Sequence, residues 1–246
     1  MISVAGGVRM LYSQAEAIMN AAPDAYLSID TDAIDWGWNA AVSVKPTEEA
    51  NISVTYRSHI DMSLEGDATL MAQNGALSMS TNGETDSFPA PAVLAISGAY
   101  TFDKLTVELT WDRTFWSEYE SMDVTFDQAN STWATVFGFP REKNWDDSSA
   151  YRIGFDYAMS DTVNILAGFA YDENPVPDET IDFVLPDSDA YLFSLGARFK
   201  VSEKMEVGVS ALYDYKESRE VNTGTVNGEY TNSRAILVSA GLQYTF

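Results

Sequence analysis

The carboxy-terminal residues of the chain alternate strictly between apolar and small or polar side chains. Because the side chains of a β-strand point alternately to its two faces, this pattern gives one apolar face and one mixed face. The apolar face carries Ile236, Val238, Ala240, Leu242, Tyr244 and Phe246. A last strand of this kind that ends in phenylalanine is typical of outer-membrane β-barrels, and the alternation recurs about ten times along the chain.

Counting this alternation predicts ten strands. They cover residues 2–13, 34–45, 51–65, 92–102, 105–115, 151–157, 163–171, 191–199, 205–215 and 236–246. The strand that begins at residue 105 is expected to run on to residue 126. Strands of about 10 residues match a tilted membrane crossing and exceed the ~5–6 residues that are usual in soluble sheets.

The predicted connections alternate between short and long. Residues 45–50, 102–104, 159–162 and 201–204 form short turns, whereas 14–33, 66–90, 127–148, 173–188 and 217–232 form long loops. Outer-membrane barrels have short periplasmic turns and long outer loops. The sequence therefore predicts an all-β fold: one antiparallel transmembrane β-barrel domain over residues 1–246, with about ten strands and both chain ends on the short-turn side.

Composition excludes several classes of protein. No segment approaches the ~18–20 consecutive apolar residues of a membrane helix. The net charge of -23, from 14 Lys+Arg against 37 Asp+Glu, disfavours binding to nucleic acid. Cysteine is absent, which excludes disulfides and thiol chemistry. With His59 as the single histidine, a catalytic triad or a histidine-rich metal site is hard to build, so we expect no enzyme and no cofactor.

Polar and charged positions are expected to have structural roles. His59 is expected to join a polar network inside the barrel with Arg57 and Asp61. Acidic pairs in the loops, such as Asp146 and Asp147, are expected to form a solvated rim near lipopolysaccharide.

Two of the long loops are unusually apolar. The 14–33 loop, expected to contain a short helix, carries Ala15, Ala17, Ile18, Met19, Ala21, Ala22, Ala25 and Leu27, and the 66–90 loop carries Met71, Ala72, Ala76, Leu77 and Met79. In one interpretation the loops pack on each other and cap the barrel. In the other they form an exposed groove for a lipid-like ligand, with the flexible methionines adapting to its shape.

Several short stretches carry a family resemblance. They are residues 36–40, 55–58, 64–67, 109–111, 116–117, 149–154, 168–177 and 185–189. In order and spacing they resemble the carboxy-terminal half of FadL-type outer-membrane long-chain fatty acid transporters. The resemblance implies a fourteen-stranded barrel with an amino-terminal hatch, of which this chain, as an amino-terminally truncated barrel, begins near the fifth strand. The hatch and the first strands have no counterpart in it.

The resemblance also implies a ligand path. In the family, ligands enter a hydrophobic groove between two outer loops that correspond to residues 14–33 and 66–90 here. An inner site then uses cationic side chains for the carboxylate. Lys143 matches one of these cations, whereas Gln14 and Glu16 stand where the second is expected. The expected substrate-binding residues are Ile18, Met19, Leu27, Met71, Leu77, Met79 and Lys143.

Together these features predict a monomeric protein of the bacterial outer membrane. Its expected function is diffusive uptake of long-chain fatty acids or other hydrophobic compounds, with outer-membrane lipid and lipopolysaccharide as further partners. A structural or adhesive small barrel without ligand, and an outer-membrane lipase-like enzyme, are the alternatives.

Overall fold

The computed structural model describes residues 1–21, 24–72, 75, 77–127, 133, 136–137, 139–183, 186–223 and 226–245, and only the backbone of 86–88. Ala22, Ala76 and the terminal Phe246, which the sequence analysis singled out, lie outside the described residues. Within that part of the chain, no helix is long and apolar enough to span a membrane.

The structure is built almost wholly of strands. They are β1 (Ile2–Ala21), β2 (Ala25–Val44), β3 (Ala50–Arg57), β4 (Ile60–Ala72), β5 (Leu77–Ala90), β6 (Val93–Phe102), β7 (Leu105–Thr114), β8 (Ser121–Phe126), β9 (Arg141–Glu142), β10 (Ser148–Ser160), β11 (Val163–Asp172), β12 (Ala190–Lys200), β13 (Met205–Lys216), β14 (Arg219–Asn222), β15 (Asn227–Tyr230) and β16 (Arg234–Tyr244). One 3-10 turn, η2 (Trp116–Glu118), separates β7 from β8.

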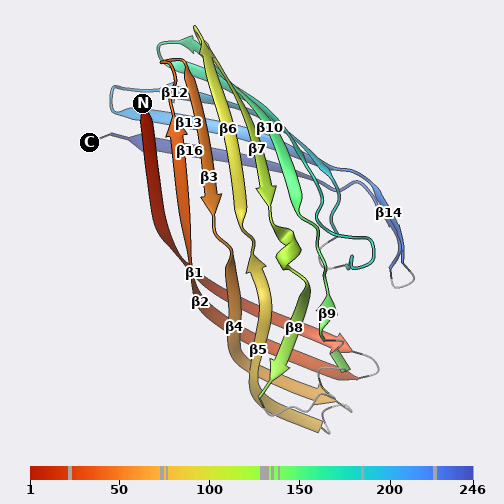
Figure 1. Cartoon of the computed structure of the whole chain (residues 1–246). Helices are drawn as coiled ribbons and strands as arrows, with labels where there is room; N and C mark the ends of the chain where they lie inside the picture. Colours follow the sequence, from red (N-terminus) through yellow and green to blue (C-terminus); the bar gives the residue numbers. More distant parts are fainter. Residues whose placement is uncertain are drawn as a thin grey trace.

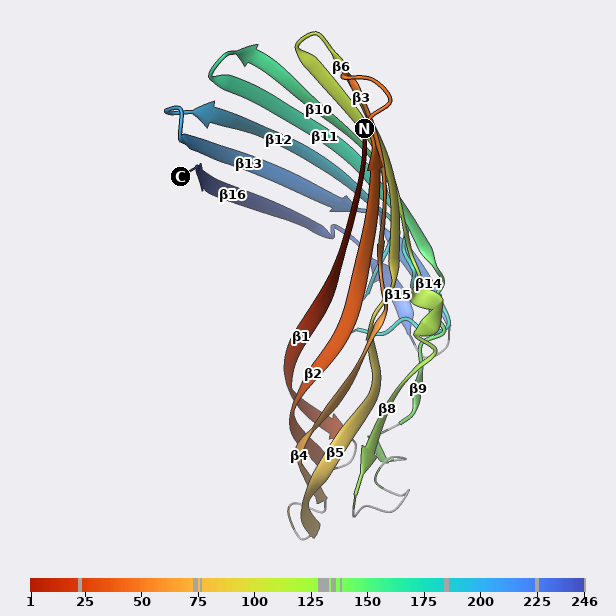
Figure 2. The ribbon, with the colours of Figure 1, turned by 60° about the vertical axis from the view of Figure 1, so that its left-hand side comes forward.

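Ten antiparallel strands form a curved wall (Figures 1 and 2). Their order is β1-β2-β3-β6-β7-β10-β11-β12-β13-β16. Both chain ends lie at the end of the wall where the short turns join β2 to β3, β6 to β7, β10 to β11 and β12 to β13. The antiparallel order and the four short turns are therefore confirmed. The ten predicted strands make up the wall, but the described chain has further strands beyond it, some of them in place of predicted loops.

The two faces of the wall differ as the alternation predicts. The outer face exposes large apolar side chains, among them Trp36 at 64% and Val238 at 79% exposure. On the inner face, the Ser53 and Ser97 hydroxyls lie 2.8 Å apart, and an ion pair joins Arg152 to Asp112. Lipid stabilises the first kind of surface and an aqueous lumen the second, as in transmembrane β-barrels.

The wall does not close on itself. Within the described residues β1 pairs only with β2, and β16 pairs only with β13. Figure 2 shows the resulting open, curved sheet. The structure is thus a partial barrel. In lipid, the backbone groups along both edges require a pairing partner.

Beyond the wall, the sheet continues into an extension made of the second half of β1, the first half of β2, β4, β5, β8 and β9 (Figure 1). The predicted 14–33 loop with its short helix is wrong, because β1 and β2 pair without interruption from Ile2–Val44 to Ala21–Ala25. The predicted 66–90 loop is the hairpin β4–β5. The strand expected to run to residue 126 instead stops at Thr114, because η2 intervenes before β8.

The alternation changes phase where the wall meets the extension. Arg57 of β3 pairs with Asn39, an odd-numbered residue of β2, whereas Glu65 of β4 pairs with Asp32, an even-numbered one. Odd-numbered residues of β2 face inward. The inner face is therefore formed by odd-numbered residues of β3 but by even-numbered residues of β4. Ser58 fills the junction: its backbone N–H donates to the Trp38 carbonyl, and its hydroxyl accepts from the Trp38 N–H. Ile60, Met62 and Leu64 consequently turn inward and are buried, contrary to the prediction of a single strand over 51–65.

The same change of phase moves His59. Its Nδ1 lies 2.6 Å from Glu118 Oε2 and its Nε2 lies 3.0 Å from Asp61 Oδ1, on the opposite face of the strand from Ile60. The predicted contact of His59 with Asp61 is therefore confirmed, whereas its predicted position in the lumen is wrong. Instead, His59 joins the β3–β4 junction to η2.

Candidate functional site

The extension carries an apolar cluster on its inner face. Leu27 on β2 lies directly opposite Leu70 on β4, and Ile29 lies opposite Ala68, because alternate residues of paired strands share a face. Phe137 and Phe139, from the long connection after β8, cover these strands. The buried members of apolar cluster 1 are Ala25, Leu27, Ile29, Ala68, Leu70, Val124, Phe137 and Phe139. Met19, Met79 and Met122 pack against its margin and remain partly exposed.

The structure brings together only some of the predicted binding residues. Leu27 is fully buried in apolar cluster 1, with Met19 and Met79 beside it. Leu77 shares their face but lies at the hairpin end and is 50% exposed. Ile18, 58% exposed, and the half-buried Met71 lie on the opposite face of the sheet. The two apolar segments thus pack into one sheet, and most of their shared face is buried rather than open as a groove.

Lys143 lies in a second cluster. It is only 7% exposed, and its Nζ lies 2.7 Å from Asp182 Oδ2. Around this ion pair the outer connections bury Tyr119, Trp145, Val176, Ile181, Val221 and Val226, which we call the aromatic cluster. Burial, together with the charge of Asp182, raises the pKa of Tyr119 to about 12. The positive charge of Lys143 is balanced by the carboxylate of Asp182.

The paired ends of β8 and the two-residue strand β9 lie between the two clusters. Met122 of β8 packs against both of them and pairs with Arg141 of β9. The Arg141 guanidinium lies 5.0 Å from the centre of the Phe139 ring, and its Nη2 donates to the Phe137 carbonyl at 3.0 Å. The same nitrogen lies 3.6 Å from Met19 Sδ at the end of β1. Sequence analysis overlooked Arg141, although it is a rare basic residue in an acidic chain and lies two residues before Lys143.

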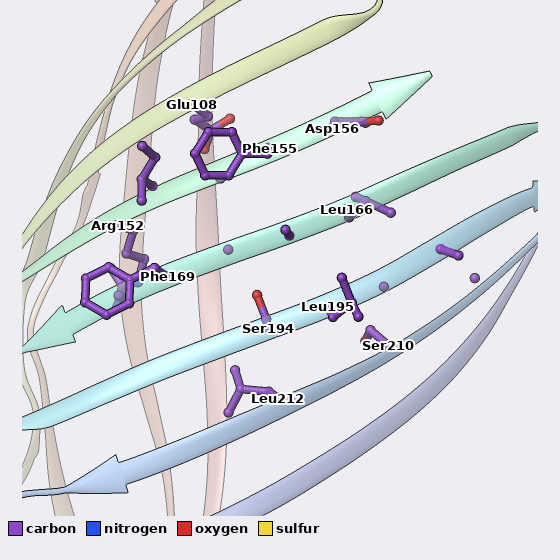
Figure 3. Close-up of a pocket in the computed structure, with 18 of the residues that line it drawn as sticks. Glu108, Arg152, Phe155, Asp156, Leu166, Phe169, Ser194, Leu195, Ser210 and Leu212 are labelled. Carbon is purple, nitrogen blue, oxygen red and sulfur yellow. The ribbon is translucent and has the colours of Figure 1, made fainter. Parts of the chain in front are cut away.

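A hollow of about 830 Å³ lies along the wall between β7 and β16. Its lining includes Gly154, Gly168, Gly196 and Gly208, with Leu166, Leu192 and Leu212 between them. Figure 3 shows Arg152 and Asp156 on β10, beside the strands that carry these leucines. Because each lumenal arginine there pairs with a carboxylate, Arg152 with Asp112 and Arg198 with Asp156, the hollow combines small, apolar and charge-balanced surface.

The other face of the extension is acidic. Asp30 lies directly opposite Asp67, and Glu65 lies opposite both Asp32 and Glu84. Facing like charges destabilise a sheet. Among the described residues, no group of three or more His, Asp or Glu side chains is arranged to hold a metal ion. Asp30, Asp32, Glu65 and Asp67 are exposed, so this face is an acidic surface open to water, continuous along β2 with exposed Ile34 and Trp36.

We expect acid to destabilise the connection that holds η2. Burial alone would raise the pKa of Asp147, but the Ser117 N–H and the Arg113 guanidinium outweigh it and hold the pKa below the usual 3.8. A lowered folded-state pKa contributes stability that is present above pH 3.8 and is lost as pH falls further. Denaturant titrations from about pH 5 to about pH 2 should show a smaller loss for Asp147→Asn than for the wild type. Asp146→Asn, whose carboxylate makes none of these bonds, should behave like the wild type.

Comparison with known proteins identifies the family. Residues 5–246 match the outer membrane protein transport protein family (OMPP1/FadL/TodX). The chain belongs to this family. As an OMPP1/FadL/TodX protein it is placed in the bacterial outer membrane, in agreement with the prediction from its alternating strands.

Curated relatives of this OMPP1/FadL/TodX chain include outer membrane protein P1 of Haemophilus influenzae, 24% identical over 230 residues that cover 88% of this chain and 48% of the relative. The long-chain fatty acid transport protein of Escherichia coli K12 is 23% identical over 222 residues, 86% of this chain and 48% of the relative. The chain thus spans about half the length of the curated relatives that it matches.

Solved structures of the family share the fold. A Pseudomonas aeruginosa FadL homologue matches with a TM-score of 0.71 and 19% identity over 98% of this chain and 61% of that protein. The CymD monoaromatic hydrocarbon channel matches with a TM-score of 0.74 and 17% identity over 99% of this chain and 69% of that protein. At these identities the likeness establishes the fold, whereas the role of each residue has to be argued from its surroundings.

Proposed function

We propose that this chain contributes to the diffusive uptake of long-chain fatty acids or other hydrophobic compounds across the outer membrane, without bond chemistry. The observation that carries the proposal is apolar cluster 1, which lies in the extension beyond the membrane wall and has methionines at its margin. Burial of each CH₂ group contributes ~0.8 kcal/mol, so a ligand with ~10 buried groups gains ~8 kcal/mol before the costs of binding.

The family assignment supports transport over the alternatives. A protein named for long-chain fatty acid transport and another named as a monoaromatic hydrocarbon channel are among the similar proteins. An enzyme of the lipase type would need a nucleophile with a base beside it, and His59 is held between two carboxylates. The partners that the proposal implies are a hydrophobic small molecule, the lipid around the wall and lipopolysaccharide around the extension, with the protein acting as a monomer.

Two methionines of one hairpin provide the test. Met79 packs against apolar cluster 1, whereas Met71, eight residues earlier, lies on the other face of the same hairpin. Met79→Ser should lower binding of a fluorescent long-chain fatty acid by about tenfold, because it removes apolar contact and adds an unpaired hydroxyl. Met71→Ser should change binding by less than about twofold.

Binding is measured on outer-membrane vesicles from cells that produce the full-length protein, with vesicles that lack it as background. Uptake of the same probe by whole cells completes the experiment. Vesicles that bind no hydrophobic probe above background would favour a structural or adhesive barrel. Ester hydrolysis that His59→Ala abolishes would favour a lipase.

A further inference from the structure

Methionine provides the only sulfur atoms of this chain. The sequence has nine methionines and no cysteine, so no thiol of the protein competes for an oxidant. The extension that carries apolar cluster 1 continues from the end of the wall with the long connections. In outer-membrane barrels this end faces the outside of the cell. An oxidant outside the cell therefore reaches the methionines of the extension without crossing the membrane.

The described methionines have different surroundings. Met62 is buried, and the Ser13 hydroxyl donates to its sulfur. Met10 lies opposite Trp36 on the lipid-facing side of the wall. Met71 lies on the face of the extension that points away from apolar cluster 1. Three described methionines pack against the cluster and stay partly exposed: Met19, Met79 and Met122.

Met19 differs from the other two in the contact that its sulfur makes. Its Sδ lies 3.6 Å from Nη2 of Arg141, whose guanidinium also donates to the Phe137 carbonyl and lies over the Phe139 ring. Among the described side chains, no carboxylate lies within 4.0 Å of this guanidinium. A thioether is only a weak acceptor. The half-buried Arg141 can therefore donate more strongly to a better acceptor in the same place.

Oxidation of Met19 would create that acceptor. When hypochlorous acid reacts with a thioether, a sulfur–oxygen bond forms, the oxygen–chlorine bond breaks, and chloride and a proton leave. The sulfur loses two electrons, and the product is a polar sulfoxide. Met19 lies directly opposite the fully buried Leu27 in the β1–β2 pair, where an unpaired oxygen would be unfavourable. Rotation of the flexible side chain toward Arg141 gives the oxygen a charge-assisted hydrogen bond.

We propose that Met19 is a site of oxidation to methionine sulfoxide, that Arg141 holds the sulfoxide oxygen, and that the modification weakens binding of hydrophobic ligands at apolar cluster 1. The modified residue is polar and turned toward Arg141, so a ligand loses apolar contact at the margin of the cluster. The effect on ligands rests on the proposed function and adds regulation to it: uptake falls where a hypohalous acid is present outside the cell.

The modification itself is measured by mass spectrometry. Outer-membrane vesicles containing the full-length protein are treated with increasing amounts of hypochlorite, and the sulfoxide at each methionine is quantified in peptides. Met19 should be oxidised at least about tenfold faster than Met62, because Met62 is buried and Met19 is partly exposed. Oxidation of Met19 no faster than that of Met62 would overturn the inference.

Trypsin measures the contact with Arg141, because it cleaves after this residue only when the guanidinium leaves its partners. Oxidation of the vesicles should slow this cleavage by about fivefold or more, since a charge-assisted hydrogen bond replaces a weak contact. In Met19→Leu, which keeps the apolar volume, the oxidant should not change the rate. Cleavage after Arg219, which is held by Asp178 and by no described methionine, is the internal control. Unchanged cleavage after Arg141 in the oxidised wild type would overturn the role of Arg141.

Binding of radiolabelled 1-hexadecanol, which carries no charge, measures the effect on ligands. The comparison uses a protein with Met79→Leu and Met122→Leu, so that Met19 is the reactive methionine among the three at the margin of the cluster. Oxidation should lower its binding of hexadecanol by about fivefold. After the further change Met19→Leu, the same treatment should lower binding by less than about twofold.

An equal loss of binding with and without Met19 would show that oxidation acts elsewhere and would overturn the regulatory role. So would unchanged binding after oxidation of the protein that retains Met19. Failure of the untreated wild type to bind hexadecanol above background would overturn the proposed function, and with it the effect on ligands. The sulfoxide at Met19 and the cleavage after Arg141 are measured without any ligand, so they decide the modification site in that case as well.

Discussion

Replacement of Gly66 by alanine is expected to break the extension while the wall stays folded. Gly66 of β4 lies between Thr31 of β2 and Gly83 of β5. A Cβ added there would lie 2.0 Å from the Asp30 carbonyl oxygen and 2.8 Å from the Thr31 Cα. Both are backbone atoms, so no rotation of a side chain can relieve the clash. The two strands would have to separate, at a cost of at least about 3 kcal/mol.

Loss of this pairing would open apolar cluster 1, because Leu27 and Leu70 face each other across the same two strands. Proteinase K should then cut residues 60–90 of the Gly66→Ala protein in intact vesicles at least about tenfold faster than in the wild type. Gly98→Ala is the matched control, since a Cβ at this strand glycine meets no atom within 4 Å. Equal protease resistance of Gly66→Ala and wild type would show that β2 and β4 do not pair as described.

The strands of the wall could be predicted from the sequence because each is marked by a pattern within its own residues. Each strand is recognised by the period of its own side chains, and Trp36, Leu109 and Val238 lie on the outer face for that reason alone. The connection lengths then orient the strands. Neither step requires knowledge of which strands pair, so both could be made from one sequence.

The extension could not be predicted in this way, because its strands depend on pairing between distant segments. Strand β2 passes from β3 to β4 along its length, and β5 pairs with β8, nearly 40 residues further on. The alanine-rich residues 15–21 resemble a helix in isolation, yet each of them has a partner on β2. The junction at Ser58 changes which residues face inward. Counting the alternation over 51–65 assumes that this does not change, so the prediction placed residues 60–64 on the wrong face.

The candidate site was predicted in part for the same reason. Met19, Leu27 and Met79 were found by their apolar character in segments expected to be polar, and the structure places them around one cluster. The partner of Lys143 is Asp182, 39 residues further along the chain, and nothing in the local sequence of either residue indicates the pair. The pairing of Lys143 is therefore a contact that only the folded chain reveals.

Removal of one member of the Lys143–Asp182 pair is expected to have the second large effect. Lys143 is 7% exposed, and Lys143→Ala would leave the Asp182 carboxylate beside the buried Tyr119 without its nearest cation. Breaking a fully buried ion pair from one side costs about 3 kcal/mol or more, and we expect up to about 3 kcal/mol here because the Asp182 side chain keeps 31% exposure to water. Asp182→Ala should also destabilise the protein, because it leaves the Lys143 ammonium group without this carboxylate. The flexible Lys143 side chain can reduce that cost by moving its ammonium group toward water.

The Lys143–Asp182 pair as a whole should contribute far less to the free energy of unfolding than the loss measured for either single variant. Replacing both residues by apolar ones of similar size, Lys143→Met with Asp182→Leu, removes the attraction and the cost of desolvation together, so its free energy of unfolding should lie within about 1 kcal/mol of the wild type. Guanidinium unfolding of the purified protein in micelles, followed by the fluorescence of the tryptophans near the pair, measures all four members of this cycle. If the double variant proved as unstable as the sum of the single ones, Lys143 and Asp182 would stabilise the aromatic cluster through separate contacts rather than as a pair.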